Sequence, residues 1–350
     1  CCLLPLPAPA DPVPDGDINI DGEVDAVDVL WAIQTVLGNR ILSDEQENHG
    51  DVAPLVSGVS VPDDVINTGD VLVMLRAALG IFDLTLPANQ FHIGDSIGVG
   101  EAADDTLGEA HHETVWSTGY QGGDGVNSIN ERLEGLAPAD YYENNDDRDP
   151  VFNHAHRGDI MADFAGQAQS VITATALTPG GDAGLVTVFL GNNDVCAPSI
   201  AEMTDPALFE EQFRAGLDVL AASDATRNAH IHVSGLPAIY WLWEAKRSNF
   251  WCRLVAWPFV PCENLLDDPA DDCESSASRQ DPDNNDYPGD GPDCKRRKDF
   301  HARIRDVYNP VLQTVTQEYR ESGQLPNARY ADIYDVRFDS DHVNSGDCFH

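Results

Sequence analysis

Two patterns of hydrophobic and polar positions divide the chain into two parts. Between residues 15 and 81, two acidic loops each precede a segment with apolar residues at helical spacing, VDVLWAIQTVLG and GDVLVMLRAALG. This internal repeat predicts a small α-helical domain. From residue 88 onwards, short apolar runs alternate with longer amphipathic stretches, which predicts a second and larger domain.

The larger part has the pattern of a parallel α/β domain. Strands are expected in FHIGDS and at residues 184–191, 230–237 and 328–336, and helices are expected near 127–135, 207–222 and 296–322. This alternation predicts a parallel sheet with helices on both faces. Residues 263–294 are rich in Asp, Pro, Asn, Ser and Gly, which predicts a long surface loop.

The charge of the chain limits its partners. With 60 acidic and 20 basic residues the formal charge is −40, so the protein repels phosphate backbones and anionic head groups. Nucleic acid is therefore not expected as a partner. No apolar stretch of the sequence reaches the ~18 residues that a membrane-spanning helix needs.

The N-terminus and the cysteines point to export. Residues 1–10, CCLLPLPAPA, end in a small-x-small pattern and are expected to be the tail of a signal peptide, so the protein is predicted to be secreted. A lipoprotein anchored through Cys1 or Cys2 is the alternative. The six other cysteines predict up to three disulfides. Their spacing favours the pairs Cys252–Cys262, Cys273–Cys294 and Cys196–Cys348.

The first acidic loop has the arrangement of a calcium-binding loop. In DINIDGEVDAVD, oxygen-bearing side chains occupy positions 1, 3, 5, 9 and 12, and a glycine occupies position 6. The expected ligands are Asp17, Asn19, Asp21 and Asp28, with the carbonyl of Glu23 and with Asp25 acting through water. In the second unit the spacing is interrupted by an insertion, and its oxygens come from Asp51, Asp63, Asp64, Asn67 and Asp70.

The duplicated loop and helix resemble the dockerin family. Two features carry this resemblance: position 12 is Asp rather than Glu, and no helix precedes the first loop. The resemblance implies structural calcium in residues 15–81 and a cohesin-bearing scaffold protein as partner. An acidic turn that only caps a helix would account for Asp28, but not for the alternating run before it.

The chemistry of the larger part centres on Gly94-Asp95-Ser96-Ile97-Gly98. This stretch fits the G-x-S-x-G turn of α/β-hydrolases, in which a serine follows a strand. The order along the chain argues against that family, because the serine follows the first strand of its domain. Moreover, an Asp-x-x-His pair, Asp347 and His350, closes the chain.

Four blocks in this order resemble the SGNH (GDSL) hydrolases. They are GDS at Ser96, the glycine in NHAHRGDIMADF at Gly158, GNND at Asn193, and DCFH at Asp347 and His350. GNNDVC and DCFH are similar to the phospholipase B-like branch. The resemblance implies a three-layer α/β/α, flavodoxin-like hydrolase domain over residues 88–350. The family continues into a further helix, so the domain is expected to be truncated at its C-terminus.

The same resemblance assigns roles to these residues. Ser96 is expected to be the nucleophile, His350 the base that takes its proton, and Asp347 the acid that orients the imidazole. The oxyanion donors would be the backbone N–H groups of Ser96 and Gly158 and the amide of Asn193. No cofactor is expected in catalysis. A second pair with the same spacing, Asp339 and His342, is the rival dyad.

The sequence therefore predicts a secreted serine esterase or lipase, with lipid or phospholipid acyl esters favoured. The alternatives are a carbohydrate acetyl esterase tethered by the dockerin-like module and a calcium-dependent adhesion or scaffold protein with an inactive hydrolase domain. The pairs His154 with His156 and His230 with His232 leave zinc as a minor alternative. The aromatic stretch at 241–259 is expected to pack in the core, with an acyl-chain groove as the second interpretation.

Overall fold

The computed structural model describes most of the chain. It covers residues 14–53, 55–56, 59–60, 62–79, 87–101, 103, 109–136, 149–178, 180–259, 262, 266, 271–340, 343 and 348. The chain forms two compact units, one of Cys1–Leu86 with Leu136–Tyr142 and one of Pro87–Gly135 with Glu143–His350. None of the helices in the described parts is long and apolar enough to span a bilayer.

The N-terminal unit is helical. It contains α1 (Ala26–Val36), α2 (Asp44–Gly50), the short antiparallel strands β1 (Leu55–Val56) and β2 (Val59–Ser60), and α3 (Thr68–Ala78). The two predicted helices, α1 and α3, pack against each other, with Ala32 and Met74 fully buried in a small core. The helix α2 was not expected from the sequence.

The C-terminal unit contains a four-stranded parallel sheet among the described residues. Its strands are β3 (Gln90–Gly94), β4 (Leu185–Phe189), β5 (His230–Ser234) and β6 (Ala328–Ala331), in that order across the sheet. In the register, His92 lies beside Thr187 and Thr187 beside His232. Each strand begins within two residues of where an apolar run predicted one.

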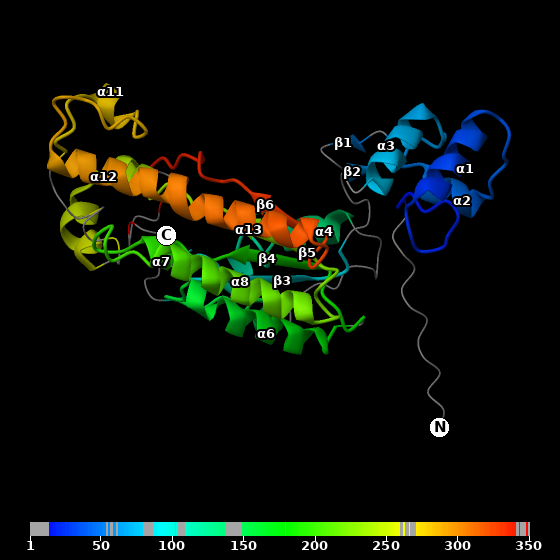
Figure 1. Ribbon diagram of the computed structural model, residues 1–350, viewed down its shortest axis with the longest axis horizontal. Coiled ribbons are helices and arrows are strands. Elements are labelled where there is room, and N and C mark those ends of the chain that lie inside the picture. The colour runs from blue at the N-terminus through cyan, green and yellow to red at the C-terminus, as the bar shows by residue number, and fades with distance from the viewer. Residues whose placement is uncertain are drawn as a thin grey trace. The chain divides into compact units, whose positions relative to one another are not determined.

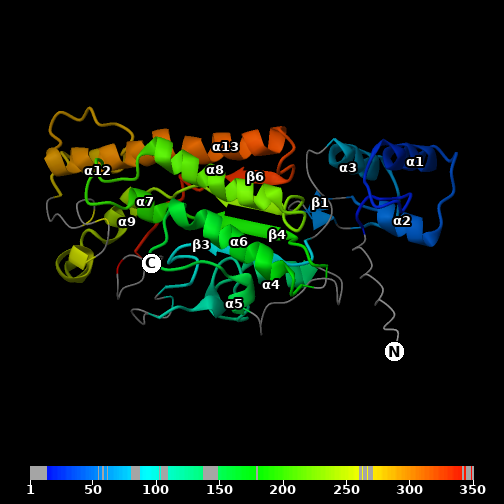
Figure 2. The same ribbon diagram turned by 60° about the horizontal axis from the view of Figure 1, so that its bottom comes forward.

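The sequence predicts helices on both faces of the sheet, and the structure describes three helices packed along one face. The helices α6 (Phe164–Thr175), α8 (Pro206–Ala222) and α13 (Asn309–Glu321) lie side by side along one face (Figures 1 and 2). On the other face, Trp116 packs edge-on against His92 and Phe189. The fold is therefore a mixed α/β fold built on a parallel sheet.

The other elements lie in the connections between the strands. They are η1 (His112–Thr114), α4 (Ile129–Leu136), α5 (Asp149–Phe152), η2 (Met161–Asp163), α7 (Asn192–Val195), α9 (Ile239–Lys246), the π-helical η3 (Cys252–Ala256), η4 (Trp257–Phe259), α11 (Ser276–Arg279), α12 (Pro292–Arg303) and the π-helical η5 (Ile304–Tyr308). The helix predicted near 296–322 is thus the continuous run of α12, η5 and α13. The helices α6 and α9 were not expected from the sequence.

The disulfides correct two of the three predicted pairs. Cys273 bonds to Cys294 as expected, but the other bonds are Cys196–Cys262 and Cys252–Cys348. Short spacing misled the prediction, because Cys252 begins a helical segment that carries it onto the C-terminal segment, while Cys196 at the end of α7 meets Cys262. Sequence spacing limits how far a cysteine can reach, but it does not fix the direction of its side chain.

Candidate active site

The nucleophile candidate Ser96 lies in a tight turn directly after β3. The backbone N–H groups of Val99 and Glu101 donate to the carbonyls of Asp95 and Ser96 at 3.2 and 3.1 Å, so the chain turns as soon as the strand ends. The fully buried Asp95 holds this turn. Its carboxylate accepts the backbone N–H of Ile97 at 3.1 Å and the side-chain amide of Asn192 at 2.9 Å.

The imidazole of His92 lies beneath this turn and explains the two glycines of the motif. A Cβ added at Gly94 or at Gly98 would collide with the ring. His92 is fully buried, and its Nδ1 lies 2.9 Å from the hydroxyl of Thr187. Burial lowers the pKa of His92 to about 3, so the ring is neutral at ordinary pH. The turn of Ser96 therefore packs directly on the uncharged imidazole ring of His92.

The segment that carries Gly158 runs beside the nucleophile turn. The backbone N–H of His156 donates to the carbonyl of Gly94 at 3.3 Å, and Gln167 exchanges two hydrogen bonds with the backbone of Gly94 at 2.9 Å. The same amide donates to Asp159 at 2.7 Å. Gly158 has a φ of +76°, a conformation that favours glycine. The structure thus brings the second predicted block next to the first.

Asn193 joins these blocks to the end of β4. It lies in α7, after Gly191 with a φ of +112°, and its side-chain amide donates to the carbonyl of Asp159 at 2.9 Å. The neighbouring Asp194 is buried and accepts the N–H of Met161 at 2.7 Å, and burial raises its pKa. An amide has two donor hydrogens, so Asn193 keeps a second one for a ligand.

Ser96 and Asn193 open into one cavity of about 350 Å³, while Gly158 does not line it. Most of the wall is apolar. The other lining residues are Ile97, Gly100, Glu101, Ala103, Thr114, Val115, Trp116, Val126, Asn192, Cys196, Pro237, Ile239, Leu242, Phe338 and Val343. Such a cavity, apolar with a few polar groups at one place, is typical of a small-molecule site.

The predicted acid and base, Asp347 and His350, lie outside the described residues, as does His342 of the rival pair. Two described residues of the same segment are informative. Val343 lines the cavity. Cys348 is fully buried, and its carbonyl accepts the indole N–H of Trp257 at 2.9 Å. Asp339 is exposed and does not line the cavity.

Cys348 is held in an unusual backbone conformation. Its φ of +60° is rare for a residue other than glycine and persists only where the surroundings impose it. Cys348 is held by, among other contacts, the disulfide to Cys252 and the hydrogen bond from Trp257. The sequence places Asp347 directly before Cys348 and His350 two residues after it. The anchored residue therefore lies within the predicted Asp-x-x-His block.

The aromatic residues of the cavity are not those that the sequence suggested. Trp241, Trp243 and Trp257 are buried in the core, as the first interpretation expected, and none of them lines the cavity. Phe250 and Trp251 of the same stretch are 74% and 48% exposed, so that interpretation was wrong for them. Its aromatic wall comes instead from Trp116 and Phe338. No motif marks these two residues, so the sequence offered no signal for them.

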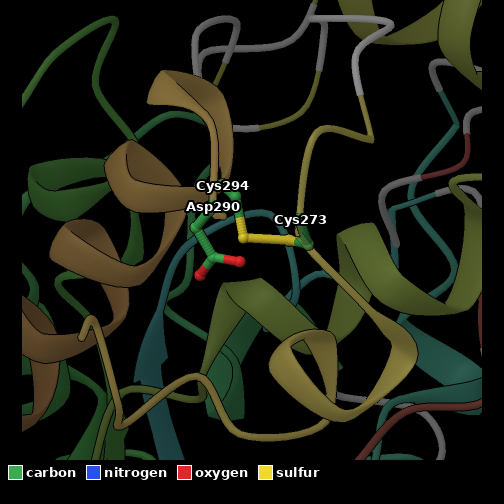
Figure 3. A group of neighbouring side chains, drawn as sticks. All are labelled: Cys273, Asp290 and Cys294. Atoms are coloured by element: carbon green, nitrogen blue, oxygen red, sulfur yellow. A yellow bond between two sulfur atoms is a disulfide. The ribbon is translucent and has the colours of Figure 1, made fainter. Parts of the chain in front are cut away.

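A group with metal-ligand atom types occurs elsewhere in the C-terminal unit. In the described parts of the chain, the one trio of His, Cys, Asp or Glu with its ligand atoms within 4.8 Å is Cys273, Asp290 and Cys294 (Figure 3). The two sulfurs are joined in a disulfide, and the carboxylate pairs with the buried ammonium of Lys298 at 2.9 Å. This group therefore stabilises a loop and offers no thiolate to a metal.

Comparison with known proteins agrees with the geometry. No curated protein matches the chain. The family model described as GDSL-like Lipase/Acylhydrolase matches residues 91–350, which includes Ser96, Gly158 and Asn193. The match covers well over half of the 350 residues, and the chain therefore belongs to the GDSL-like lipase/acylhydrolase family of ester hydrolases.

Proposed function

We propose that the C-terminal unit hydrolyses the acyl esters of lipids through an acyl-serine intermediate. The observation that carries this proposal is that Ser96 and Asn193 lie on the wall of one apolar cavity. A serine hydroxyl supplies the nucleophile, the amide can stabilise an oxyanion, and the apolar wall suits an acyl chain.

In the proposed reaction, the hydroxyl of Ser96 attacks the ester carbonyl and passes its proton to His350, whose imidazolium Asp347 stabilises. Negative charge on the carbonyl oxygen is stabilised by the amide of Asn193 and by the backbone N–H group of Ser96. The family resemblance implies the backbone N–H of Gly158 as a third donor, although Gly158 does not line the cavity. His350 then protonates the leaving alcohol. Water, activated by the same imidazole, hydrolyses the acyl-serine and restores the enzyme.

The cavity favours a long acyl group over an acetyl group. At about 350 Å³ it lies in the range of pockets that enclose whole small molecules, and an acetyl group would leave most of its apolar wall exposed to water. A carbohydrate acetyl esterase is the second candidate, supported only by the dockerin-like repeat. A binding protein with an inactive hydrolase unit is the third.

The test is labelling with a fluorophosphonate probe, combined with a p-nitrophenyl ester series of increasing chain length. We expect labelling of the wild type, its loss in Ser96→Ala, and full labelling of Ser170→Ala, which removes an exposed serine from α6. Turnover should rise from acetate to longer esters. Labelling with a preference for acetate would favour the acetyl esterase, and an unlabelled, folded wild type would exclude a serine hydrolase.

We further propose that the N-terminal unit is a dockerin-like calcium module. The first support is that its two loops fold alike despite the insertion. Asp17 accepts the backbone N–H groups of loop positions 5 and 6, and Asp51 accepts those of Asp63 and Asp64. The residue at position 6 has a positive φ in both loops, +92° at Gly22 and +63° at Asp64.

The last acidic residue of each loop gives the second support. Asp28 and Asp70 are both fully buried. They accept the backbone N–H groups of Asp25 and Asn67 at 2.9 and 2.7 Å, and each closes the capping box of its helix. Burial raises the pKa of both carboxyl groups, because a buried carboxylate lacks hydration. A bound cation would supply a positive charge beside these two buried carboxylates.

The donor sets fit calcium unequally. Both loops offer the oxygen ligands that calcium prefers, but the third position is Asn19 in the first loop and Ala53 in the second. No three carboxylates of either loop lie within 4.8 Å of one another among the described residues, so amide, carbonyl and water oxygens would have to complete the sites. We therefore expect the first loop to bind more tightly.

Calcium titration of single variants tests whether the first loop binds calcium more tightly than the second. We expect Asp28→Asn to remove the tighter of two binding events and Asp70→Asn the weaker one, with Asp44→Asn, an exposed change in α2, as the matched control. Binding that is equal in all three variants would contradict the assignment. A single site removed by Asp28→Asn would restrict the proposal to the first loop.

We propose that this module attaches the enzyme to a cohesin-bearing scaffold outside the cell. The support is that α1 and α3 expose apolar side chains at equivalent places, Leu30 and Leu37 at 50% and 67%, and Leu72 and Leu79 at 57% and 67%. The three disulfides suit an oxidising compartment. We expect an immobilised panel of cohesins to retain the protein. The double variant Leu37→Ser with Leu79→Ser should not be retained. Absence of retention across the panel would contradict the proposal.

A further inference from the structure

The C-terminal unit carries a compact exposed apolar patch, formed by Phe250 and Trp251 just before η3 and by Leu254 within it. These side chains are 74%, 48% and 53% exposed. They occupy positions i, i+1 and i+4 of one helical stretch, so they fall within an arc of roughly 100° around its axis, the width of the apolar stripe of an amphipathic helix. Single exposed apolar residues are common on protein surfaces, but three within five residues form a contiguous patch.

The charge around the apolar patch differs from that of the rest of the chain. Residues 245–262 contain no Asp or Glu, although the chain has 60 acidic residues in 350. Within the same stretch, Arg253 lies between the patch residues. The stretch that carries the patch therefore contributes no carboxylate of its own, and Lys246, Arg247 and Arg253 make it basic.

The apolar patch is tied to the wall of the cavity. It follows α9, whose Ile239 and Leu242 line the cavity, and Figure 2 shows the yellow-green turn of η3 beside that helix. Cys252, which lies between Trp251 and Leu254 in the sequence, is fully buried and is bonded to Cys348. Attachment of the patch to a surface would therefore hold the cavity close to that surface.

A second copy of the chain is a poor occupant of the apolar patch. A stable interface buries roughly 800 Å² on each partner, and three side chains supply far less than that. Two copies would also bring together two molecules of formal charge −40, which repel each other. A lipid surface requires neither a large area nor complementary charge.

We propose that Phe250, Trp251 and Leu254 insert into a zwitterionic lipid surface and dock the cavity on it. The proposal rests on the proposed function as a lipid esterase. Aromatic and aliphatic side chains on one side of a short helix bind at the boundary between head groups and acyl chains. The overall negative charge makes neutral head groups a better surface than anionic ones.

The test is co-sedimentation with phosphatidylcholine vesicles in the Ser96→Ala background, which prevents hydrolysis during binding. We expect Phe250→Ser with Leu254→Ser to weaken binding at least about tenfold, since two apolar side chains no longer leave water. The matched control, Leu177→Ser with Leu208→Ser, removes two apolar residues of similar exposure from the same unit, 59% and 45%, and should bind like the parent.

With Ser96 intact, the Phe250→Ser/Leu254→Ser variant should hydrolyse a soluble ester at the parental rate and vesicle lipid about tenfold more slowly. Equal binding of the test and control variants would overturn the proposal, and so would tighter binding to phosphatidylglycerol vesicles than to phosphatidylcholine. A wild type that hydrolyses soluble esters but does not bind vesicles would refute docking alone. Vesicle binding without hydrolysis of any ester would refute the proposed function instead.

Discussion

The two sides of the cavity are held in place by different means. On one side, the turn of Ser96 and the residue Asn193 are fixed by short hydrogen bonds around Asp95, Gln167 and Asp159. On the other side, the C-terminal segment contributes Val343, and five residues later in the sequence Cys348 is bonded to Cys252 and accepts the indole N–H of Trp257. We call these the nucleophile wall and the C-terminal wall.

The difference shows how each wall obtains its rigidity. The nucleophile wall begins where strands β3 and β4 end, so the sheet already determines most of its geometry. The C-terminal wall follows β6 by more than ten residues, and a connection of that length needs attachments of its own. Substitution of hydrogen-bonding residues should therefore disturb the nucleophile wall, and removal of a disulfide should disturb the C-terminal wall.

The largest effect on activity is expected within the nucleophile wall. Asn193→Ala removes an oxyanion donor and should lower kcat by roughly 10² to 10³ while KM changes little. Steady-state kinetics with a soluble ester measure this change. Gln167→Ala is a useful companion, because it loosens the same wall without touching the cavity. A larger loss of kcat in Gln167→Ala than in Asn193→Ala would speak against the role of Asn193.

Removal of the disulfide of the C-terminal wall should have the next largest effect. We expect Cys252→Ala with Cys348→Ala to lower kcat by roughly 10 to 100, since small displacements of catalytic groups are costly. The control is Cys273→Ala with Cys294→Ala, which opens the loop shown in Figure 3. Kinetics of both variants are compared with their unfolding in urea.

Loop closure predicts losses of roughly 5 kcal/mol for the Cys252–Cys348 pair, with its separation of 96 residues, and ~3 kcal/mol for the Cys273–Cys294 pair, with 21 residues. Both pairs thus stabilise the fold, but only the first should affect kcat. Equal loss of kcat in the two variants would mean that general stability, not the position of Cys348, controls the reaction.

A smaller effect is expected from Trp257→Phe. This change keeps a buried aromatic ring and removes the one indole N–H that donates to Cys348, so kcat should fall several-fold and stability by about 1 kcal/mol. Trp243→Phe, another buried tryptophan that does not line the cavity, is the matched control. An identical decrease of kcat in both variants would show that the hydrogen bond has no particular role.

The last prediction concerns His92 and the dependence of stability on pH rather than kcat. Burial lowers its pKa to about 3 and that of His154 to about 4, while in the unfolded chain both are near 6.5. The unfolded state therefore binds more protons between these values, and the free energy of unfolding falls as the pH drops from about 6.5 towards 3 to 4.

For each imidazole the loss between pH 6.5 and pH 5 is about 2 kcal/mol. Urea unfolding of His92→Asn should show a shallower pH dependence over this range, whereas His156→Asn, whose side chain is 68% exposed, should follow the wild type. A parallel slope in His92→Asn would mean that other groups cause the acid sensitivity.

The sequence allowed much of the nucleophile wall to be predicted. Strand patterns located β3 and β4, and the motifs that follow them bring Ser96 and Asn193 to one cavity. These residues are close in sequence to the ends of strands, so local order and sheet topology together determine their places. The motif around Gly158 also predicted that this residue lies beside the turn of Ser96, although Gly158 does not line the cavity.

The C-terminal wall and the apolar patch could not be predicted in the same way. The pairing of Cys252 with Cys348, the hydrogen bond from Trp257 and the contribution of Trp116 to the cavity all join residues distant in sequence. Their positions depend on how helical segments pack, and neither periodicity nor spacing encodes that. The assignment of Asp347 and His350 stays a prediction.

The insertion between Asp51 and Asp63 has a consequence for the evolution of the N-terminal unit. Its strands β1 and β2 pair antiparallel, with Leu55 opposite Ser60, so the extra chain leaves the loop and returns to nearly the same place. Lengthening a surface loop adds little to the entropic cost of closing it. The inserted segment can therefore be lengthened, shortened or replaced while the two flanking aspartates keep their backbone contacts. The position is a natural entry point for new sequence, in evolution or in engineering.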